Sequence, residues 1–280
     1  MRHRSFAALA LAAVASLGLA ACGGSGSTSS DASGSGSSSD VVTLTVGATP
    51  SPHAKILTYI NDNLAEAEGI KLNIVEYTDY VQPNTALNDG ELDANFFQTV
   101  PYLENAEKQA GYDFEAGAGI HLEPLGVFSN KHKSLDELPD GGTIGIISDT
   151  SNQERALRLL ATQGLVSIPE GEGDVNVNTV TKLKDFSFNE VEGPQLVRSL
   201  EDFDYAVING NFAQEGGLSL SGDALVVESP VDNPAVNVLV WKSGSDKAAA
   251  IAKLEELLHS DQVKQYIEQT WSDGSVIPAF

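Results

Sequence analysis

An arginine at the start of a predicted helix is the first candidate for holding a ligand. Arg155 lies in the first turn of a helix expected from about 152 to 163, directly after the apolar run 143–147, and Ser151 and Glu154 have the spacing of a capping box. A cation at this positive helix end is mildly unfavourable by itself. It becomes favourable when the guanidinium and the free backbone N–H groups share an anion, such as a carboxylate. Arg155 is therefore either a carboxylate-binding residue or an exposed surface arginine.

Two asparagines occupy positions where an amide needs a partner. Asn209 ends the apolar run 205–208, and Asn237 lies inside the run 236–240. A buried amide without a hydrogen-bond partner costs about 1–3 kcal/mol, so Asn237 binds either the protein backbone or a ligand. If both asparagines face a cleft, their side-chain oxygens can accept from an ammonium group while Arg155 takes a carboxylate. These groups would then fit the two ends of an amino acid.

Three aromatic residues near loop ends form a candidate apolar wall. They are Tyr80, Phe97 and Tyr102. Aromatic side chains in such positions belong either to the core or to a pocket. Rings grouped in a pocket would suit a thioether, because each sulfur–ring contact contributes about 0.3–1.5 kcal/mol.

Patterns for catalysis and metal binding are weak. The chain has no Gly-x-Ser-x-Gly, Ser-x-x-Lys or His-Glu-x-x-His pattern, and its single cysteine is Cys22. A metal site built from His53, His121 and carboxylates is conceivable, but the spacing of these residues gives it no support. We therefore expect no enzyme, no bound metal and no cofactor. An anchored hydrolase and an adhesion protein without a small ligand remain the alternatives.

The N-terminal residues have the features of a secretory leader. Arg2 and Arg4 precede an apolar stretch at 6–19, which is too short for a membrane-spanning helix of about 20 residues. The stretch ends in Leu-Ala-Ala-Cys22, which resembles the lipobox of bacterial lipoproteins, where the cysteine is acylated. The alternative is an ordinary signal peptide with an incidental cysteine. We expect a signal peptide at 1–21, a lipid on Cys22 and an extracytoplasmic protein anchored to the cell membrane.

A flexible tether is expected to follow the anchor. Apart from Cys22 itself, the segment 22–40 consists almost wholly of Gly, Ser, Ala, Thr and Asp, so it cannot bury apolar surface.

The charge of the chain is strongly acidic. The formal net charge is −23, and loss of Arg2 and Arg4 with the leader brings it to −25. Because the chain has no basic stripe to neutralise phosphates, we expect no nucleic-acid partner.

The residues from Val41 onward alternate between strand and helix patterns. A strand, a helix and a second strand follow one another within 42–74, which is a βαβ unit and implies a parallel sheet. Further strands are expected at 92–97, 125–129, 143–147, 205–208 and 235–241, and further helices at 101–111, 152–163 and 247–271, the last broken near 260–261. We expect an α/β fold with a ligand cleft between two lobes, which comprise 41–128 plus 232–280 and 129–231.

Several short motifs in series resemble one known family. They are Asp79-Tyr-Val-Gln-Pro-Asn84, Asp93-Ala-Asn-Phe-Phe-Gln98 with Pro101-Tyr102, Ser134-Leu-Asp-Glu-Leu138, Asp149-Thr-Ser-Asn152 with Arg155, Ala206-Val-Ile-Asn209 and Val236-Asn237. In this order, from about Val42 to Phe280, they are similar to the NlpA/MetQ-type methionine-binding lipoproteins. The resemblance implies a periplasmic-binding-protein-like fold that delivers methionine to the permease of an ABC importer. We expect such a receptor to be a monomer.

The resemblance also implies the composition of one ligand site. The residues that it places there are Arg155, Asn209, Asn237, Tyr80, Phe97, Tyr102 and Thr99. The arginine would hold the ligand carboxylate, the asparagines the amino and carboxylate ends, and the three aromatic residues the side chain. Members of this family have a histidine at the position of Thr99, so the choice among L-methionine, D-methionine, its oxidised forms and a short methionine peptide stays open. Another amino acid or a metal ion is the alternative ligand.

Overall fold

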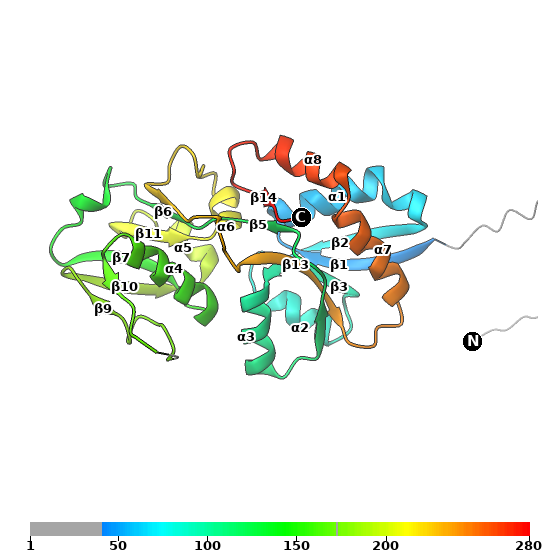
Figure 1. Cartoon of the computed structure of the whole chain (residues 1–280), viewed down its shortest axis with the longest axis horizontal. Coiled ribbons are helices and arrows are strands. Elements are labelled where there is room, and N and C mark those ends of the chain that lie inside the picture. The colour runs from blue at the N-terminus through cyan, green and yellow to red at the C-terminus, as the bar shows by residue number, and fades with distance from the viewer. Residues whose placement is uncertain (1–40, 172) are drawn as a thin grey trace, which may run out of the picture. The chain divides into compact units, whose positions relative to one another are not determined.

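The computed structural model describes residues 41–171 and 173–280. The predicted signal peptide, Cys22 and the tether lie outside these residues, and their roles stay predictions. The described residues belong to one compact unit, in which most strands divide between two sheets with helices packed on them (Figure 1). The predicted α/β fold with two lobes is confirmed.

The first lobe is built on a sheet with the strand order β14-β5-β13-β3-β1-β2, and β4 also pairs with β13. Its strands are β1 (Val42–Ala48), β2 (Ile70–Glu76), β3 (Ala94–Thr99), β4 (Phe114–Ala116), β5 (His121–Leu122), β13 (Val236–Lys242) and β14 (Ile277–Pro278). Strand β1 pairs in parallel with both β2 and β3, which confirms the predicted βαβ unit. Strand β13 instead returns antiparallel to β3.

Apolar helix faces hold the first lobe together. Its helices are η1 (Pro50–Ala54), α1 (Lys55–Asn63), η2 (Ala65–Glu68), α2 (Gln82–Asn88), α3 (Val100–Ala110), α7 (Ala248–Leu258) and α8 (Asp261–Thr270). Buried side chains of α1, α7 and α8, such as Ile60, Leu254 and Ile267, share one apolar cluster with β1. The predicted break near 260–261 is confirmed, because Ser260 caps α8 by accepting from the backbone N–H of Val263 at 3.4 Å.

The second lobe is built on a sheet with the strand order β10-β7-β11-β6-β12. Its strands are β6 (Gly126–Phe128), β7 (Gly142–Ile147), β10 (Phe186–Val191), β11 (Tyr205–Ile208) and β12 (Val226–Val227), beside the separate pair β8 (Val166–Ser167) and β9 (Thr181–Lys182). Its helices are η3 (Leu135–Glu137), α4 (Thr150–Thr162), α5 (Gly193–Arg198) and α6 (Gly210–Glu215). Strands β10 and β11 both pair in parallel with β7, so their carboxyl ends meet at one edge of the sheet.

Within the described residues, the chain passes between the two sheets at 123–125 and at 228–235. The first passage precedes the predicted boundary at 128, because β6 pairs with β11 and already belongs to the second sheet. The sequence shows one apolar run at 125–129 and gives no sign of the change of sheet. The second predicted boundary, at 231–232, lies within the later passage.

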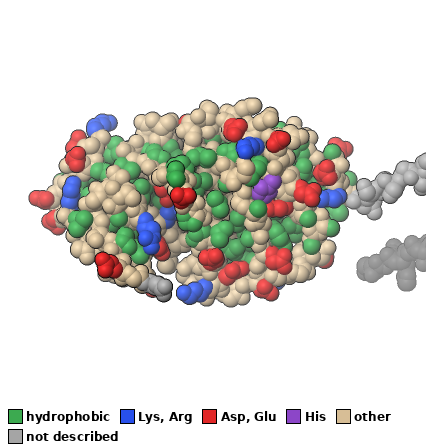
Figure 2. All heavy atoms as spheres, viewed as in Figure 1, with side chains coloured by type: hydrophobic (Ala, Val, Ile, Leu, Met, Phe, Trp, Pro, Cys, Tyr) green, Lys and Arg blue, Asp and Glu red, His purple; other side chains and the backbone are tan. Residues whose placement is uncertain are grey.

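The length of the helices and the distribution of surface charge were compared with what a membrane or a nucleic acid requires of a protein. Among the described residues, no helix is both long and apolar enough to cross a membrane. On the face shown in Figure 2, acidic side chains are spread over the surface and the basic side chains stand singly. This face therefore offers no basic stripe of the kind that nucleic-acid binding needs.

Candidate functional site

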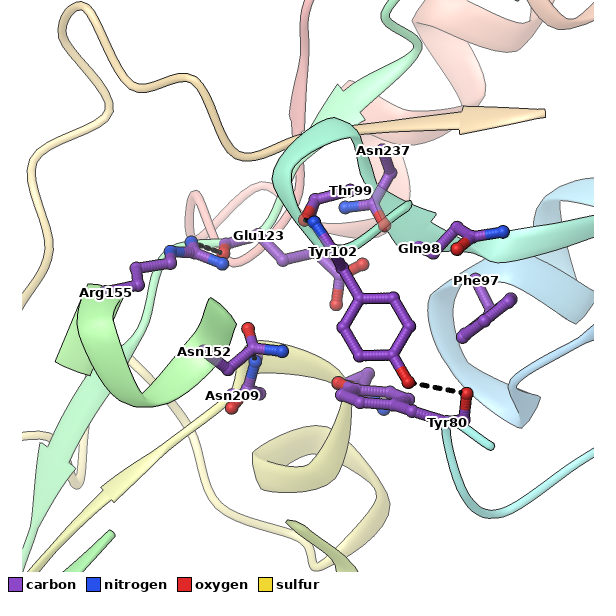
Figure 3. A pocket seen from close by; sticks show the side chains of 12 residues that line it. Tyr80, Phe97, Gln98, Thr99, Tyr102, Glu123, Asn152, Arg155, Asn209 and Asn237 are labelled. Atoms are coloured by element: carbon purple, nitrogen blue, oxygen red, sulfur yellow. Dashed lines mark hydrogen bonds between the residues drawn. The ribbon is translucent and has the colours of Figure 1, made fainter. Parts of the chain in front are cut away.

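A pocket lies between the two lobes, and the space inside it is about 340 Å³ when the part open to solvent is included. Its lining residues are Tyr80, Phe97, Gln98, Thr99, Tyr102, Glu123, Asn152, Arg155, Asn209, Gly210, Asn211 and Asn237 (Figure 3). All seven ligand-site residues predicted from the sequence are therefore brought together in one pocket, although they come from five separate segments of the chain.

Arg155 is held in place by the protein and is not an exposed surface residue. Its Nε donates to Oε1 of Glu228 at 2.8 Å, and its Nη2 donates to Oε2 of Glu228 at 2.5 Å and to the carbonyl of Glu123 at 2.7 Å. The Arg155 and Glu228 side chains are only 14% and 13% exposed. These bonds leave Nη1 as the guanidinium nitrogen without a hydrogen bond among the described residues, and this nitrogen is available to a ligand.

A chain of hydrogen bonds orients Asn209. The carboxylate of Asp149 caps α4 by accepting from the backbone N–H of Asn152 at 2.8 Å, and it also accepts from Nδ2 of Asn152 at 3.1 Å. Oδ1 of Asn152 in turn accepts from Nδ2 of Asn209 at 2.8 Å. The side-chain oxygen of Asn209 is left as an acceptor at the pocket. The predicted capping box was wrong, because Asp149 is the cap and Ser151 lies inside the first turn.

Asn237 directs its side-chain nitrogen at the pocket, whereas Asn209 directs its side-chain oxygen there. Its Oδ1 lies 3.1 Å from Nε2 of His53, whose other nitrogen, Nδ1, lies 2.6 Å from Oγ1 of Thr49. Because an amide oxygen only accepts, Nε2 of His53 carries the hydrogen and the Thr49 hydroxyl donates to Nδ1. The group of Asn237 left for the pocket is its Nδ2 donor. The alternative in which both asparagine oxygens face an ammonium group therefore does not fit Asn237.

A buried cluster of His53, His121 and Glu123 adjoins the pocket. From the sequence, the two histidines were named only as conceivable metal ligands, and Glu123 was not predicted as a site residue. Oε1 of Glu123 lies 2.9 Å from Nε2 of His121 and 3.4 Å from Nε2 of His53. Burial raises the pKa of Glu123 to about 7 and lowers the pKa values of His53 and His121 to about 4 and about 3. Both histidines are therefore neutral at pH 7. A usable signal was present, because His121 and Glu123 are two residues apart in an extended segment and share one face.

The same three side chains are of the types that bind metal ions, and their ligand atoms lie within 4.8 Å of one another. In this arrangement, however, both ring nitrogens of His53 take part in hydrogen bonds with Thr49 and Asn237. A cation would have to break the bond that orients Asn237. The geometry therefore favours a hydrogen-bonded cluster.

The three predicted aromatic residues contact one another and form an apolar wall of the pocket. The ring centroids of Tyr80, Phe97 and Tyr102 are 5.7–5.9 Å apart in each pair. The hydroxyl of Tyr102 donates to the carbonyl of Tyr80 at 2.8 Å (Figure 3), and the side chain of Thr99 caps α3 by accepting from the N–H of Tyr102. Thr99 thus helps to fix the tyrosine that follows it. The ring of Tyr80 also stacks on Phe212 of α6 at 4.7 Å, across the two lobes.

A wider groove continues outward from the pocket. The space inside it is about 1,810 Å³ when the part open to solvent is included, and it shares Thr99, Asn152 and Arg155 with the pocket. It is lined by α3, by α4 and by the passage 227–235. The groove gives the inner pocket a route to solvent.

Comparison with known proteins assigns the chain to a family. The sequence model of the NlpA lipoprotein family matches residues 44–280. The methionine-binding lipoprotein MetQ of Bacillus subtilis (strain 168) is 37% identical over 246 residues, which cover 84% of this chain and 87% of that protein. A crystal structure of a lipoprotein from Actinomyces odontolyticus ATCC 17982 is 88% identical, with a TM-score of 0.85, and the match covers 86% of this chain and 100% of that one. The structure of a nutrient binding protein from Burkholderia cenocepacia, bound to methionine, is 34% identical, with a TM-score of 0.79 and coverage of 85% and 100%. This chain therefore belongs to the NlpA lipoprotein family.

Proposed function

We propose that this protein is the lipid-anchored, extracytoplasmic substrate-binding protein of an ABC importer, and that its lobes close on methionine or a close analogue. The observation that carries the proposal is the wall of the pocket, which brings donors, an acceptor and three aromatic rings together. Two relatives support it, because the Bacillus protein is a methionine-binding lipoprotein and the Burkholderia protein has a structure with bound methionine. In this role the protein makes and breaks no covalent bond of the ligand.

The polar groups of the pocket assign the two ends of the amino acid. Nη1 of Arg155 and Nδ2 of Asn237 are donors, so they would hold the carboxylate. Oδ1 of Asn209 is an acceptor, so it would bind the ammonium group. This arrangement keeps the predicted roles of Arg155 and the two asparagines and specifies which asparagine serves which end.

The rings of Tyr80, Phe97 and Tyr102 would enclose the methionine side chain. A thioether among three rings gains from sulfur–aromatic contacts of about 0.3–1.5 kcal/mol each. Thr99, at the start of α3, supports this wall through the backbone of Tyr102.

Isothermal calorimetry with the purified folded protein tests the ligand. We expect L-methionine to bind, and norleucine, which has the same shape without sulfur, to bind more weakly. Titrations with D-methionine, methionine sulfoxide and glycylmethionine would rank the remaining candidates. Absence of heat and of a thermal shift with every one of these ligands at millimolar concentration would overturn the proposal.

The anchor is proposed from Cys22 and its lipobox, and membership of a lipoprotein family supports it. The tether would keep a monomeric receptor within reach of the permease while leaving it free to dock. Cys22→Ser should move the protein from the membrane fraction to the medium without changing its methionine affinity. Retention of the variant in the membrane would contradict lipid anchoring at this residue.

A further inference from the structure

A buried ammonium group needs a counter-charge, and the neutral oxygen of Asn209 does not supply one. Transfer of an unpaired ion into a protein interior is strongly unfavourable. Apart from the two tyrosines, the ionisable side chains among the described residues that line the pocket are Arg155 and Glu123. The arginine serves the carboxylate end, so Glu123 is the group of suitable charge for the amino end.

The geometry of Glu123 leaves one carboxylate oxygen for a ligand. Its Oε1 is directed at the two histidines, with Nε2 of His121 at 2.9 Å and Nε2 of His53 at 3.4 Å. Its Oε2 has no side-chain hydrogen bond among the described residues and lies beside the backbone of Gly210, where an added Cβ would come within 3.5 Å of it. Figure 3 shows the carboxylate pointing into the middle of the pocket.

His121 holds this carboxylate in place through a hydrogen bond, and His53 lies beside it while donating its own N–H to Asn237. The bond from His53 to Asn237 fixes the hydrogen on Nε2 of His53, and when Glu123 is ionised its short contact with His121 requires a hydrogen on Nε2 of His121. With both imidazoles neutral, the histidines supply no full positive charge. The negative charge of Glu123 therefore lacks a full counter-ion on this side until a cationic group enters the pocket.

Resting on the proposed function, we propose that Glu123 is the counter-ion of the ligand ammonium group and makes the site specific for α-amino acids over the corresponding acids without an amine. His121 positions the carboxylate, and His53 positions Asn237. One cluster thus organises both the amino end and one donor at the carboxylate end of the ligand.

Binding should then be coupled to loss of a proton from Glu123. Its pKa of about 7 in the free protein lies above the usual value, and an ammonium group beside the carboxylate lowers the pKa in the complex. Affinity should therefore fall by up to about tenfold per pH unit as the pH falls below 7. The other groups that act on Glu123 are His53, His121, Arg155, Glu215, Tyr80 and the backbone N–H of Asn211, which lowers its pKa. His53 and His121, with pKa values of about 4 and about 3, stay neutral near pH 6 and 7.

Calorimetry with methionine and with 4-(methylthio)butanoate, which lacks the amino group, tests the proposal. Wild-type protein at pH 6, titrated in two buffers of different ionisation enthalpy, should release close to one proton per methionine and should bind the acid without the amine far more weakly. Glu123→Gln should lose about 100-fold or more in methionine affinity and should release no proton. It should bind the amine-free acid at least as well as wild type does.

Glu215→Gln is the matched control, because burial also raises the pKa of Glu215 to about 7 but this carboxylate does not line the pocket. It should keep the proton release and most of the methionine affinity. A wild-type protein that binds methionine without releasing a proton at pH 6 would overturn the role of Glu123 even if Glu123→Gln failed to fold. A wild-type protein that binds no methionine would instead overturn the proposed function.

Discussion

The guanidinium of Arg155 serves the fold as well as the proposed site. It bridges Glu228 and the carbonyl of Glu123, and these two residues belong to the two passages between the lobes. The backbone N–H of Leu125 also donates to Glu228 at 3.1 Å, so the passages are bonded to each other at the same point. Truncation of Arg155 would therefore leave a largely buried carboxylate without its ion pair, and loss of binding alone would not prove a role in the ligand site.

A paired substitution separates the two roles of Arg155. Arg155→Gln should lower the free energy of unfolding by about 2 kcal/mol, because Glu228 loses its partner, and it should lower methionine affinity at least about 100-fold. Arg155→Gln combined with Glu228→Gln should recover most of the stability but none of the affinity. Denaturant unfolding and calorimetry measure the two effects.

The exposed pair of Arg158 and Glu154 on the same helix is the control. Its side chains are 57% and 40% exposed, so replacing both by Gln should change stability by less than about 0.5 kcal/mol and leave binding intact. Wild-type affinity in Arg155→Gln would contradict the carboxylate assignment. Recovery of affinity in the double variant would mean that Arg155 acts through the fold alone.

The sequence was sufficient to predict residues whose polarity conflicts with their surroundings. Asn237 inside an apolar run and Arg155 at a helix start both line the pocket, as predicted. It was not sufficient to predict Glu123, one of 39 acidic residues, because nothing local distinguishes its carboxylate. His53 and His121 are far apart in the chain, and their contact, with ring centroids 4.9 Å apart, arises only when η1 lies beside β5 in the folded protein.

At the scale of the elements, the start of α4 couples helix stability to the site. Asp149→Ala removes the cap, which should cost about 1 kcal/mol of unfolding free energy, and it also frees Asn152 from the carboxylate that orients it. Because Asn152 holds Asn209, methionine affinity should fall by about tenfold as well. Thermal or denaturant unfolding and calorimetry on the same preparation give both values.

Ser260→Ala provides the comparison for the cap. Ser260 caps α8 in the first lobe and does not line the pocket, so its loss should reduce stability by about the same amount without changing affinity. An Asp149→Ala variant with weakened stability but unchanged methionine binding would show that the Asp149–Asn152–Asn209 chain does not orient the ligand.

Long, deeply buried elements were predicted from the sequence, whereas partly buried or very short elements were missed. The βαβ unit and strand β7 were predicted because their apolar periodicity is continuous. Strand β10 was missed, because it lies at the edge of the second sheet and its mixed sequence Phe-Ser-Phe-Asn-Glu-Val is only partly buried. Two-residue strands such as β5 and β14 are too short to show any period and exist only because their neighbours are in place.

At the scale of the whole molecule, α6 joins the two lobes beside the pocket. Its Gln214 accepts through Oε1 from the hydroxyl of Ser51 at 2.9 Å and from Nε1 of Trp271 at 2.8 Å, both in the first lobe. Asn211 of the same helix accepts from the hydroxyl of Tyr80. The described structure is therefore a closed arrangement, in which side chains of both lobes complete the pocket wall.

Closure predicts that a residue outside the pocket controls affinity. Gln214→Ala removes two bonds between the lobes, so the closed state should be less populated and methionine should bind about tenfold more weakly, although Gln214 does not line the pocket. Small-angle scattering should show a larger radius of gyration for the variant at subsaturating methionine. Gln109→Ala is the control, because within the described part of the chain the amide of Gln109 donates a hydrogen bond to Asn105 alone, on the exposed face of α3. If Gln214→Ala matched wild type in both affinity and scattering, the contacts of α6 would be permanent parts of the fold, and closure on the ligand would have to take place elsewhere between the lobes.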